Sequence, residues 1–143
     1  MGRVLGVDLG TRRVGLALTD PDRTIASPLE TIPFVSEAKI AERLAAICRE
    51  RQADEVVVGV PAGEGEAERN VAARCLRVVE RLRAMGFTVD TWDESFSSRE
   101  AEAALHQVGW RRKRDPGKVD AVAASLVLRD WLDSRYTRRE TND

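Results

Sequence analysis

The amino-acid sequence predicts one α/β domain built on a five-stranded mixed sheet with helices on both faces. Three extended segments come first in the chain, and helical and extended segments alternate after them. This order favours three antiparallel strands followed by two strands that are reached through helices. Pro28, inside the third extended segment, cannot donate a hydrogen bond to a ladder and belongs at a sheet edge. The predicted spatial order is therefore 3-2-1-4-5, with the first strand at the centre.

The first half of the chain supplies the predicted hairpin and the edge strand. Arg3–Leu9 is short and apolar and predicts a buried strand, and Val14–Thr19 predicts a second strand that pairs with it antiparallel across a short turn. Thr24–Ile32 predicts the third strand. Ser36 is suited to cap a helix that continues with apolar residues at helical spacing to Arg51.

Strands and helices alternate in the second half. The β-branched run Asp54–Val60 predicts a strand covered on both faces, and residues 66–85 predict an amphipathic helix that Gly86 ends. Phe87–Trp92 predicts the fifth strand. The capping box at 97–100 predicts a third helix to about Val108. After a basic loop, Gly109–Lys118, the last helix is expected from about Val119 to Ser134, with Val119, Val122, Ala123, Leu126 and Val127 on one face.

Composition narrows the function classes. The 23 Lys and Arg against 24 Asp and Glu leave a net charge of −1, which excludes a whole-protein basic field but not a local one. No apolar run approaches the ~20 residues of a membrane span, and the first residues lack the apolar stretch of a signal peptide. We expect a cytoplasmic protein without membrane contact, with one domain at 1–134 and a frayed polar tail at 135–143. Cys48 and Cys75 are expected to be reduced and partly buried.

Acidic residues stand at three places in the sequence where a carboxylate calls for a bound partner or a functional role. Asp8 interrupts a strand predicted to be central, so it requires a cation or a hydrogen-bond donor, or else accepts N–H groups of the following turn. Asp93 and Glu94 close the fifth strand, and alternation points one of them into any shared site. Asp120 lies near the start of the last helix, where an acidic residue is also stabilising without any further role.

Carboxylates from these separate elements can converge at one edge of the sheet. Their mutual repulsion requires cations, and oxygen ligands without His or Cys suit Mg²⁺ or Mn²⁺. Two such ions about 4 Å apart can activate a water and stabilise the leaving oxygen in phosphodiester cleavage. The acidic positions therefore indicate metal-dependent phosphodiester hydrolysis.

A run of cations stands directly ahead of Asp120, with an aromatic residue beside it. These positions predict a surface that binds the phosphates of nucleic acid and stacks on a base, or alternatively a solvated charged loop. They are Trp110, Arg111, Arg112, Lys113, Arg114 and Lys118. His106 is expected on a helix surface rather than as a base.

Four blocks of the chain resemble the YqgF/RuvX family. They match its G-x-D-x-G-T hairpin, its V-G-L-P loop, its D-E-R-[LF]-[ST]-T block and its K-x-D-x-x-A-A block, and they lie at Leu5–Thr11 with Val14–Ala17, Val57–Pro61, Asp93–Ser98 and Lys118–Ala124. The resemblance implies an RNase H-like fold and a nuclease, a candidate for processing pre-16S rRNA or for resolving Holliday junctions. It also implies that Asp8, Glu94 and Asp120 are the catalytic metal ligands.

The sequence departs from the family pattern at two places. Ser95 stands where the family has Arg, and the loop after Pro61 is shorter and lacks the family's Asn/Asp-Gly stretch. RNA and branched DNA both remain open as substrates, and a junction resolvase would act as a homodimer. Two other classes compete: a sugar-kinase or actin-like ATPase, which shares the opening hairpin but needs a second domain, and a non-catalytic nucleic-acid-binding module.

Overall fold

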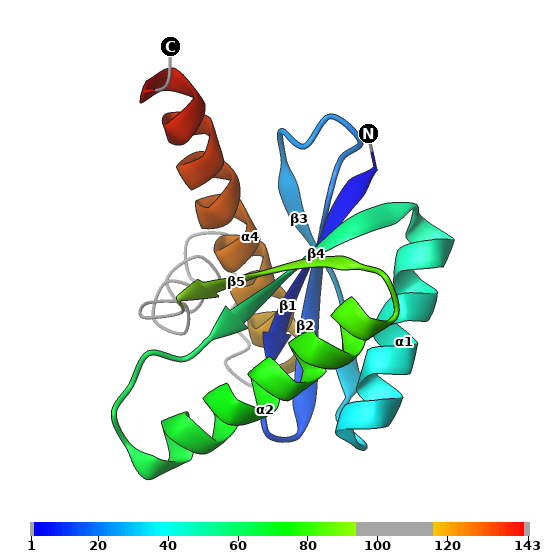
Figure 1. The fold of residues 1–143 in the computed structure, drawn as a ribbon, viewed down its shortest axis with the longest axis vertical. Helices are drawn as coiled ribbons and strands as arrows, with labels where there is room; N and C mark the ends of the chain where they lie inside the picture. The colour runs from blue at the N-terminus through cyan, green and yellow to red at the C-terminus, as the bar shows by residue number, and fades with distance from the viewer. Residues whose placement is uncertain (1, 94–115, 142–143) are drawn as a thin grey trace.

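A computed structural model describes residues 2–93 and 116–141 of the chain. The sheet has the order β3-β2-β1-β4-β5, as predicted, with β1 at its centre. Figure 1 shows the elements in chain order: β1 (Arg3–Leu9), β2 (Arg13–Thr19), β3 (Ala26–Pro33), α1 (Glu37–Arg51), β4 (Ala53–Val60), α2 (Glu66–Ala84), β5 (Thr88–Asp93) and α4 (Pro116–Thr141).

The pairing directions define two edges of the sheet. β1 pairs antiparallel with β2 and parallel with β4, and β4 pairs parallel with β5. The carboxyl ends of β1, β4 and β5 therefore meet at one edge, which we call the C-terminal edge, and their starts meet at the N-terminal edge. Ligand sites of open α/β sheets lie at the carboxyl ends of the parallel strands.

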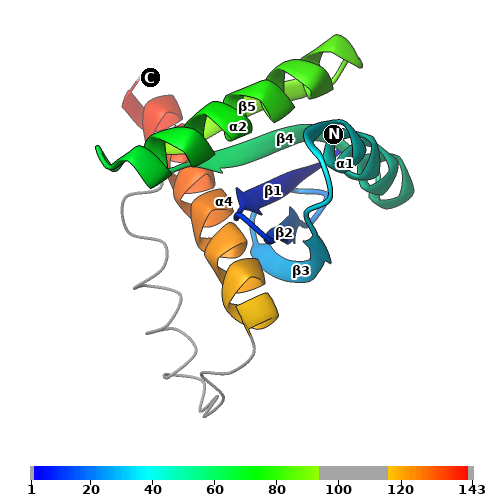
Figure 2. The same ribbon diagram turned by 90° about the horizontal axis from the view of Figure 1, so that it is seen from below.

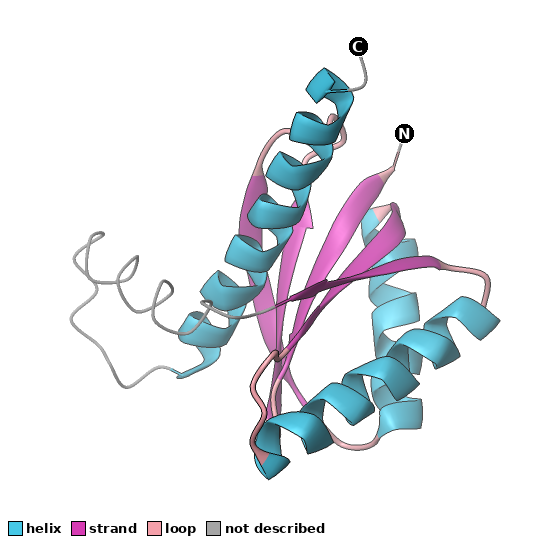
Figure 3. Ribbon diagram, turned by 60° about the vertical axis from the view of Figure 1, so that its left-hand side comes forward, coloured by secondary structure: helices cyan, strands magenta, loops and turns pink. Residues whose placement is uncertain are grey.

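The helices cover the two faces unequally. Among the described helices, α1 and α2 pack on one face and α4 crosses the other (Figures 2 and 3). The larger core lies under α1 and α2, and the core under α4 contains Val4, Ala17, Val57, Leu128 and Trp131. Of the described helices, none has the length and apolar character needed to cross a membrane.

Local chemistry explains several element boundaries. Ser36 caps α1 as predicted, because its Oγ accepts the backbone N–H of Lys39 at 3.1 Å. Pro28 lies on the edge strand, at an irregularity of the β2–β3 ladder. β3 starts later than predicted because the Asp20 carboxylate accepts the backbone N–H groups of Thr24 and Ile25 at 2.7 and 2.9 Å and holds this stretch in a turn.

The last helix is longer than predicted at both ends. Pro116 suits a first helical turn, where its missing N–H costs nothing, so the helix begins inside the expected basic loop and includes Lys118. The segment expected to be a frayed tail is helical as far as Thr141. Arg135 anchors this part, because it stacks over Trp131 at 4.7 Å and pairs with a carboxylate of β4.

The cysteines are free, as predicted, and more deeply buried than expected. Burial raises the pKa of the Cys48 thiol to about 11. Cys48 lies in α1 and Cys75 in α2, both in the larger core. The helix expected up to Val108 lies outside the described residues.

Candidate active site at the C-terminal edge

Asp8 lies on the sheet face that α4 covers, which we call the α4 face. Val4 belongs to the core under α4, and a methyl group on Gly6 would lie 3.0 Å from Cβ of Leu128 in that helix. Since side chains alternate along a strand, Asp8 faces the same way. It is partly buried and stands next to the carboxyl end of the central strand.

The neighbours of Asp8 across the sheet are glycines. Asp8 is in register with Gly15 of β2 on one side and with Gly59 of β4 on the other. Because glycine has no side chain, no side chain projects from the sheet at either of these positions beside the Asp8 carboxylate. This arrangement lets another element approach the carboxylate closely.

The element that approaches is the start of α4. A methyl group built on Gly15 would overlap the carbonyl oxygen of Asp120, so backbone meets backbone at this point. Gly15 is in register with Asp8, and Asp120 therefore lies above the strand adjacent to Asp8. The fold thus brings two of the predicted carboxylates, from opposite ends of the chain, to one place on the α4 face.

Asp120 has a cationic partner that sequence reasoning missed. The Nε of Arg13 donates to Oδ2 of Asp120 at 3.0 Å, and the two side chains are 44% and 27% exposed. Arg13 begins β2 at the hairpin turn, next to a second arginine. The signal available in the sequence was this pair of basic residues within a few positions of Asp8. The contact gives Asp120 one of the cationic partners that clustered carboxylates require.

Alternation separates the two acidic residues that end β5. Trp92 packs with the core under α4, so Asp93, the next residue, belongs to the opposite face from Asp8. Asp93 is therefore not a partner of Asp8. Glu94, which the family resemblance selects, lies outside the described residues.

The basic surface predicted before Asp120 falls largely outside the described part of the chain. That holds for Trp110, Arg111, Arg112, Lys113 and Arg114. Lys118 lies in the first turns of α4, and its side chain is not among those described. Its position, two residues before Asp120, places its backbone at the same end of α4.

The described donors fit a hard divalent cation in chemistry but do not form a full ligand set. Asp8 and Asp120 provide carboxylate oxygens only, the donor type that Mg²⁺ and Mn²⁺ prefer. Among the described residues, no group of three or more His, Cys, Asp or Glu is placed to hold a metal ion.

Comparison with solved structures defines the class of fold. The Thermus thermophilus RuvC in complex with a Holliday junction superposes with a TM-score of 0.62 over 96% of this chain and 97% of that chain, at 17% identity. The Fowlpox virus resolvase in complex with Holliday junction DNA reaches 0.59 over 92% and 97%, at 10% identity. The molecule thus has the RNase H-like fold of the RuvC-type nucleases, as the resemblance implied.

Comparison with known sequences identifies the family of the chain. Residues 2–134 match the RuvX family, described as Holliday junction resolvase, and the chain belongs to this family. A relative from Mycobacterium ulcerans, named as a candidate pre-16S rRNA nuclease, is 36% identical over 95% of this chain and 81% of its own length. A relative from Mycobacteroides abscessus carries the same name and is 36% identical over 94% of this chain and 82% of its own length.

Proposed function

We propose that this protein is a divalent-metal-dependent nuclease that uses Asp8, Glu94 and Asp120 to bind Mg²⁺ or Mn²⁺ and hydrolyses phosphodiester bonds. The observation that carries the proposal is the meeting of Asp8 and Asp120 on the α4 face at the C-terminal edge. Two carboxylates from distant segments repel each other, and a fold that juxtaposes them at a ligand-binding edge indicates a cation site.

Each residue has a defined part in this proposal. A bound divalent cation supplies stabilisation of the negative charge that develops on phosphate oxygens during cleavage. The central strand holds Asp8 rigidly, and the contact of Gly15 with the backbone of Asp120 sets the position of the second carboxylate. Arg13 orients that carboxylate through its Nε–H. The cations of residues 111–118 and Trp110 are proposed to bind the nucleic-acid backbone and a base.

The substrate we propose is precursor 16S rRNA, because the relatives that cover most of this chain carry that name. Holliday junction DNA is the second candidate, since the family description names it and the fold matches a RuvC bound to such a junction. Symmetric cleavage of a junction needs two active sites and therefore a homodimer, whereas trimming of rRNA needs one.

The test is cleavage of labelled pre-16S rRNA and of a labelled four-way DNA junction, each with Mg²⁺ or Mn²⁺. We expect metal-dependent cleavage of the RNA by the wild type, and a rate lowered by about 10²–10³-fold in Asp8→Asn, because a lost metal ligand removes several kcal/mol of transition-state stabilisation. Binding of the RNA is expected to survive. Asp54→Asn, an acidic residue at the N-terminal edge, is the matched control and should cleave normally.

The outcomes separate the candidate functions. Equal cleavage by Asp8→Asn and the wild type overturns the assignment of Asp8. Tight binding by the wild type without cleavage under either metal supports the non-catalytic binding module. A strong preference for the junction, together with a dimer in solution, reverses the ranking of the two substrates.

A further inference from the structure

The turn between β1 and β2 is held rigidly at the C-terminal edge. We call residues 10–13 the hairpin tip. The backbone N–H of Gly10 donates to the carbonyl of Arg13 at 2.8 Å, which closes the turn, and the N–H of Phe34 donates to the carbonyl of Arg12 at 2.9 Å. The second bond ties the tip to the end of β3. The side chain of Arg12 is exposed on this pinned turn.

A guanidinium from α2 is fixed against the same tip. Arg74 lies over the ring of Phe34, 4.5 Å from its centroid, and its Nη1 donates to the carbonyl of Thr11 at 3.5 Å. These two contacts hold the guanidinium of Arg74 beside the hairpin tip. The hydrogen bond to Thr11 uses one of the five N–H donors of an arginine, so the group keeps donors for a further acceptor.

A carboxylate near Arg74 already has an arginine partner. Glu37 at the start of α1 is close enough to Arg74 to feel its charge, and it forms a bidentate pair with Arg77 at 2.7 and 3.0 Å. The hydrogen bond from Arg77, together with the charges of Arg77, Arg81 and Arg74, lowers the pKa of Glu37. Because Arg77 matches the charge of Glu37, Arg74 and Arg12 together add positive charge to the tip.

The tip also adjoins the candidate active site. Asp8 is three residues from Thr11 along the chain, which places the two at most about 10 Å apart. Arg13 lies on the α4 side of the tip, where it contacts Asp120, and Arg74 comes from α2 on the other side. A strand whose scissile phosphate reaches Asp8 would therefore place neighbouring phosphates over the tip.

We infer that Arg12 and Arg74 form a phosphate-binding surface on the hairpin tip that holds the nucleic-acid backbone next to Asp8 and Asp120. The inference rests on the proposed function for its substrate class. Its two arginines are distant in the sequence from the cations of residues 111–118. Arginine is suited to this role because its planar fork matches phosphate oxygens.

The experiment measures binding without cleavage. Fluorescence anisotropy of a labelled single-stranded RNA, and of a DNA of the same sequence, is recorded in EDTA over a series of KCl concentrations. Each phosphate contact contributes about 0.7 to the slope of log K against log salt on a single strand. The double variant Arg12→Ala/Arg74→Ala is expected to lower that slope by about 1.4 for the RNA and for the DNA alike.

The structure offers a matched control for Arg74. Arg49 also lies over a phenylalanine, with its guanidinium 5.9 Å from the ring centroid of Phe87, but it is at the N-terminal edge. Arg49→Ala should leave the slope unchanged. Arg74→Lys keeps the charge without the planar fork and should retain most of the slope. If a thermal unfolding measurement shows that Arg74→Ala is not folded, Arg12→Ala alone should lower the slope by about 0.7.

The results distinguish this inference from the proposed function. An unchanged slope in a folded double variant overturns the phosphate-binding surface, and metal-dependent cleavage by the wild type would then still support the nuclease. A lowered slope in a protein that does not cleave supports the surface and overturns the nuclease. An equal loss of slope in Arg49→Ala also overturns the inference, because any surface arginine would then have the same effect.

Discussion

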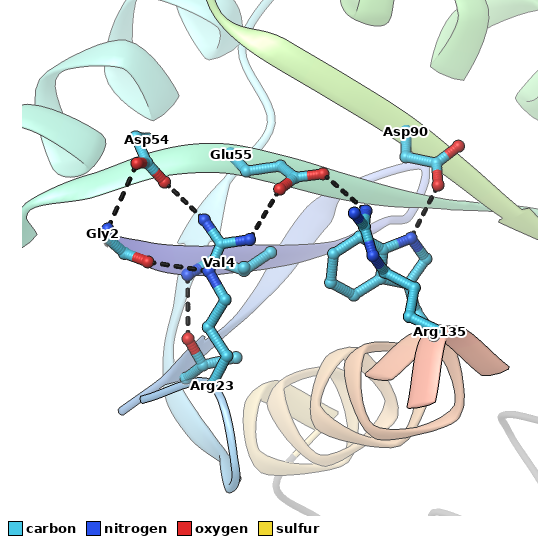
Figure 4. A network of polar contacts seen from close by, with 9 residues as sticks. Gly2, Val4, Arg23, Asp54, Glu55, Asp90 and Arg135 are labelled. Atoms are coloured by element: carbon cyan, nitrogen blue, oxygen red, sulfur yellow. Dashed lines mark hydrogen bonds and ion pairs between the residues drawn. The ribbon is translucent and has the colours of Figure 1, made fainter. Parts of the chain in front are cut away.

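Both edges of the sheet contain an arginine paired with a carboxylate, but the pairs differ in how far they are buried. At the N-terminal edge, Arg23 donates to the carbonyl of Gly2 and to the carboxylates of Asp54 and Glu55 at 2.9, 2.7 and 2.8 Å (Figure 4). Arg135 of α4 reaches the other oxygen of Glu55 at 3.2 Å. This network joins the β2–β3 turn, β4 and α4, and Glu55 is buried.

At the C-terminal edge, the arginine–carboxylate pair is more open. The Arg13 and Asp120 side chains are 44% and 27% exposed, against 18% and 11% for Arg23 and Glu55. A buried, multiply bonded pair is costly to break, whereas an exposed pair contributes little and exchanges partners readily. The difference shows why the N-terminal edge acts as a structural clamp and why the C-terminal edge is suited to binding ligands.

The largest expected effect is on the rate of cleavage, when either of the two acidic residues at the end of β5 is replaced. Glu94→Gln should lower the rate of metal-dependent RNA cleavage by about 10²–10³-fold, as loss of a metal ligand removes several kcal/mol of stabilisation. Asp93→Asn should leave it within a few-fold, because Asp93 belongs to the opposite face. Single-turnover cleavage of labelled RNA measures both rates. The reverse pattern would show that the alternation along β5 breaks at its end.

The next effect concerns the contact that places Asp120. Gly15→Ala should destabilise the protein by about 3 kcal/mol, because the added methyl overlaps backbone atoms of α4 that cannot move alone. Gly6→Ala, where the nearest atom is Cβ of Leu128 at 3.0 Å, should cost about 1 kcal/mol. Urea unfolding gives both values, and equal losses would contradict the close approach at Gly15.

The clamp and the open pair can be compared directly by removing one arginine from each. Arg23→Ala should cost about 2 kcal/mol, since it leaves the buried Glu55 with less compensation. Arg13→Ala should cost less than about 1 kcal/mol, because its pair with Asp120 is exposed. Chemical denaturation measures the two free energies of unfolding. A larger loss for Arg13→Ala would remove the distinction between the edges.

The smallest effect is a pH dependence at the start of α1. The bidentate pair with Arg77 lowers the pKa of Glu37, so its contribution to stability is complete above the usual glutamate range and is lost as the pH falls through the folded-state value. The contribution should be small, since both side chains reach solvent. Glu37→Gln should match the wild type in stability at low pH and fall slightly below it at neutral pH, as urea titrations at both pH values would show.

Local patterns were enough to predict the strand order and most element boundaries. Pro28 indicated the edge, and Ser36 indicated the start of α1, because both act through their own backbone or the next few residues. Asp8 and Asp120 could be proposed as partners because each is an acidic residue that needs a reason at its position, one in the central strand and one near the start of the last helix. The assignment of Glu94 and of the cations at 110–114 stays a prediction.

Long-range contacts were beyond the sequence patterns. Nothing local to Trp131 shows that it is buried under the sheet with its Nε1 donating to Asp90 at 2.7 Å, so the apolar face predicted for the last helix omitted it. Likewise, Leu76 fits the helical spacing of α2 but is 49% exposed, because the orientation of the helix on the sheet selects Val78 instead. Such selections depend on packing between elements.

The sequence by itself determined the order of the strands, most element boundaries and the choice of Asp8, Glu94 and Asp120 as candidate ligands, since periodicity, turn residues and the cost of burying charge act locally. Only the tertiary structure decided that Gly15 admits the backbone of Asp120 beside Asp8, that Arg13 pairs with Asp120, and that Arg74 lies against the hairpin tip. These contacts join residues far apart in the chain. Their geometry follows from how α2 and α4 pack on the sheet, which no short pattern encodes.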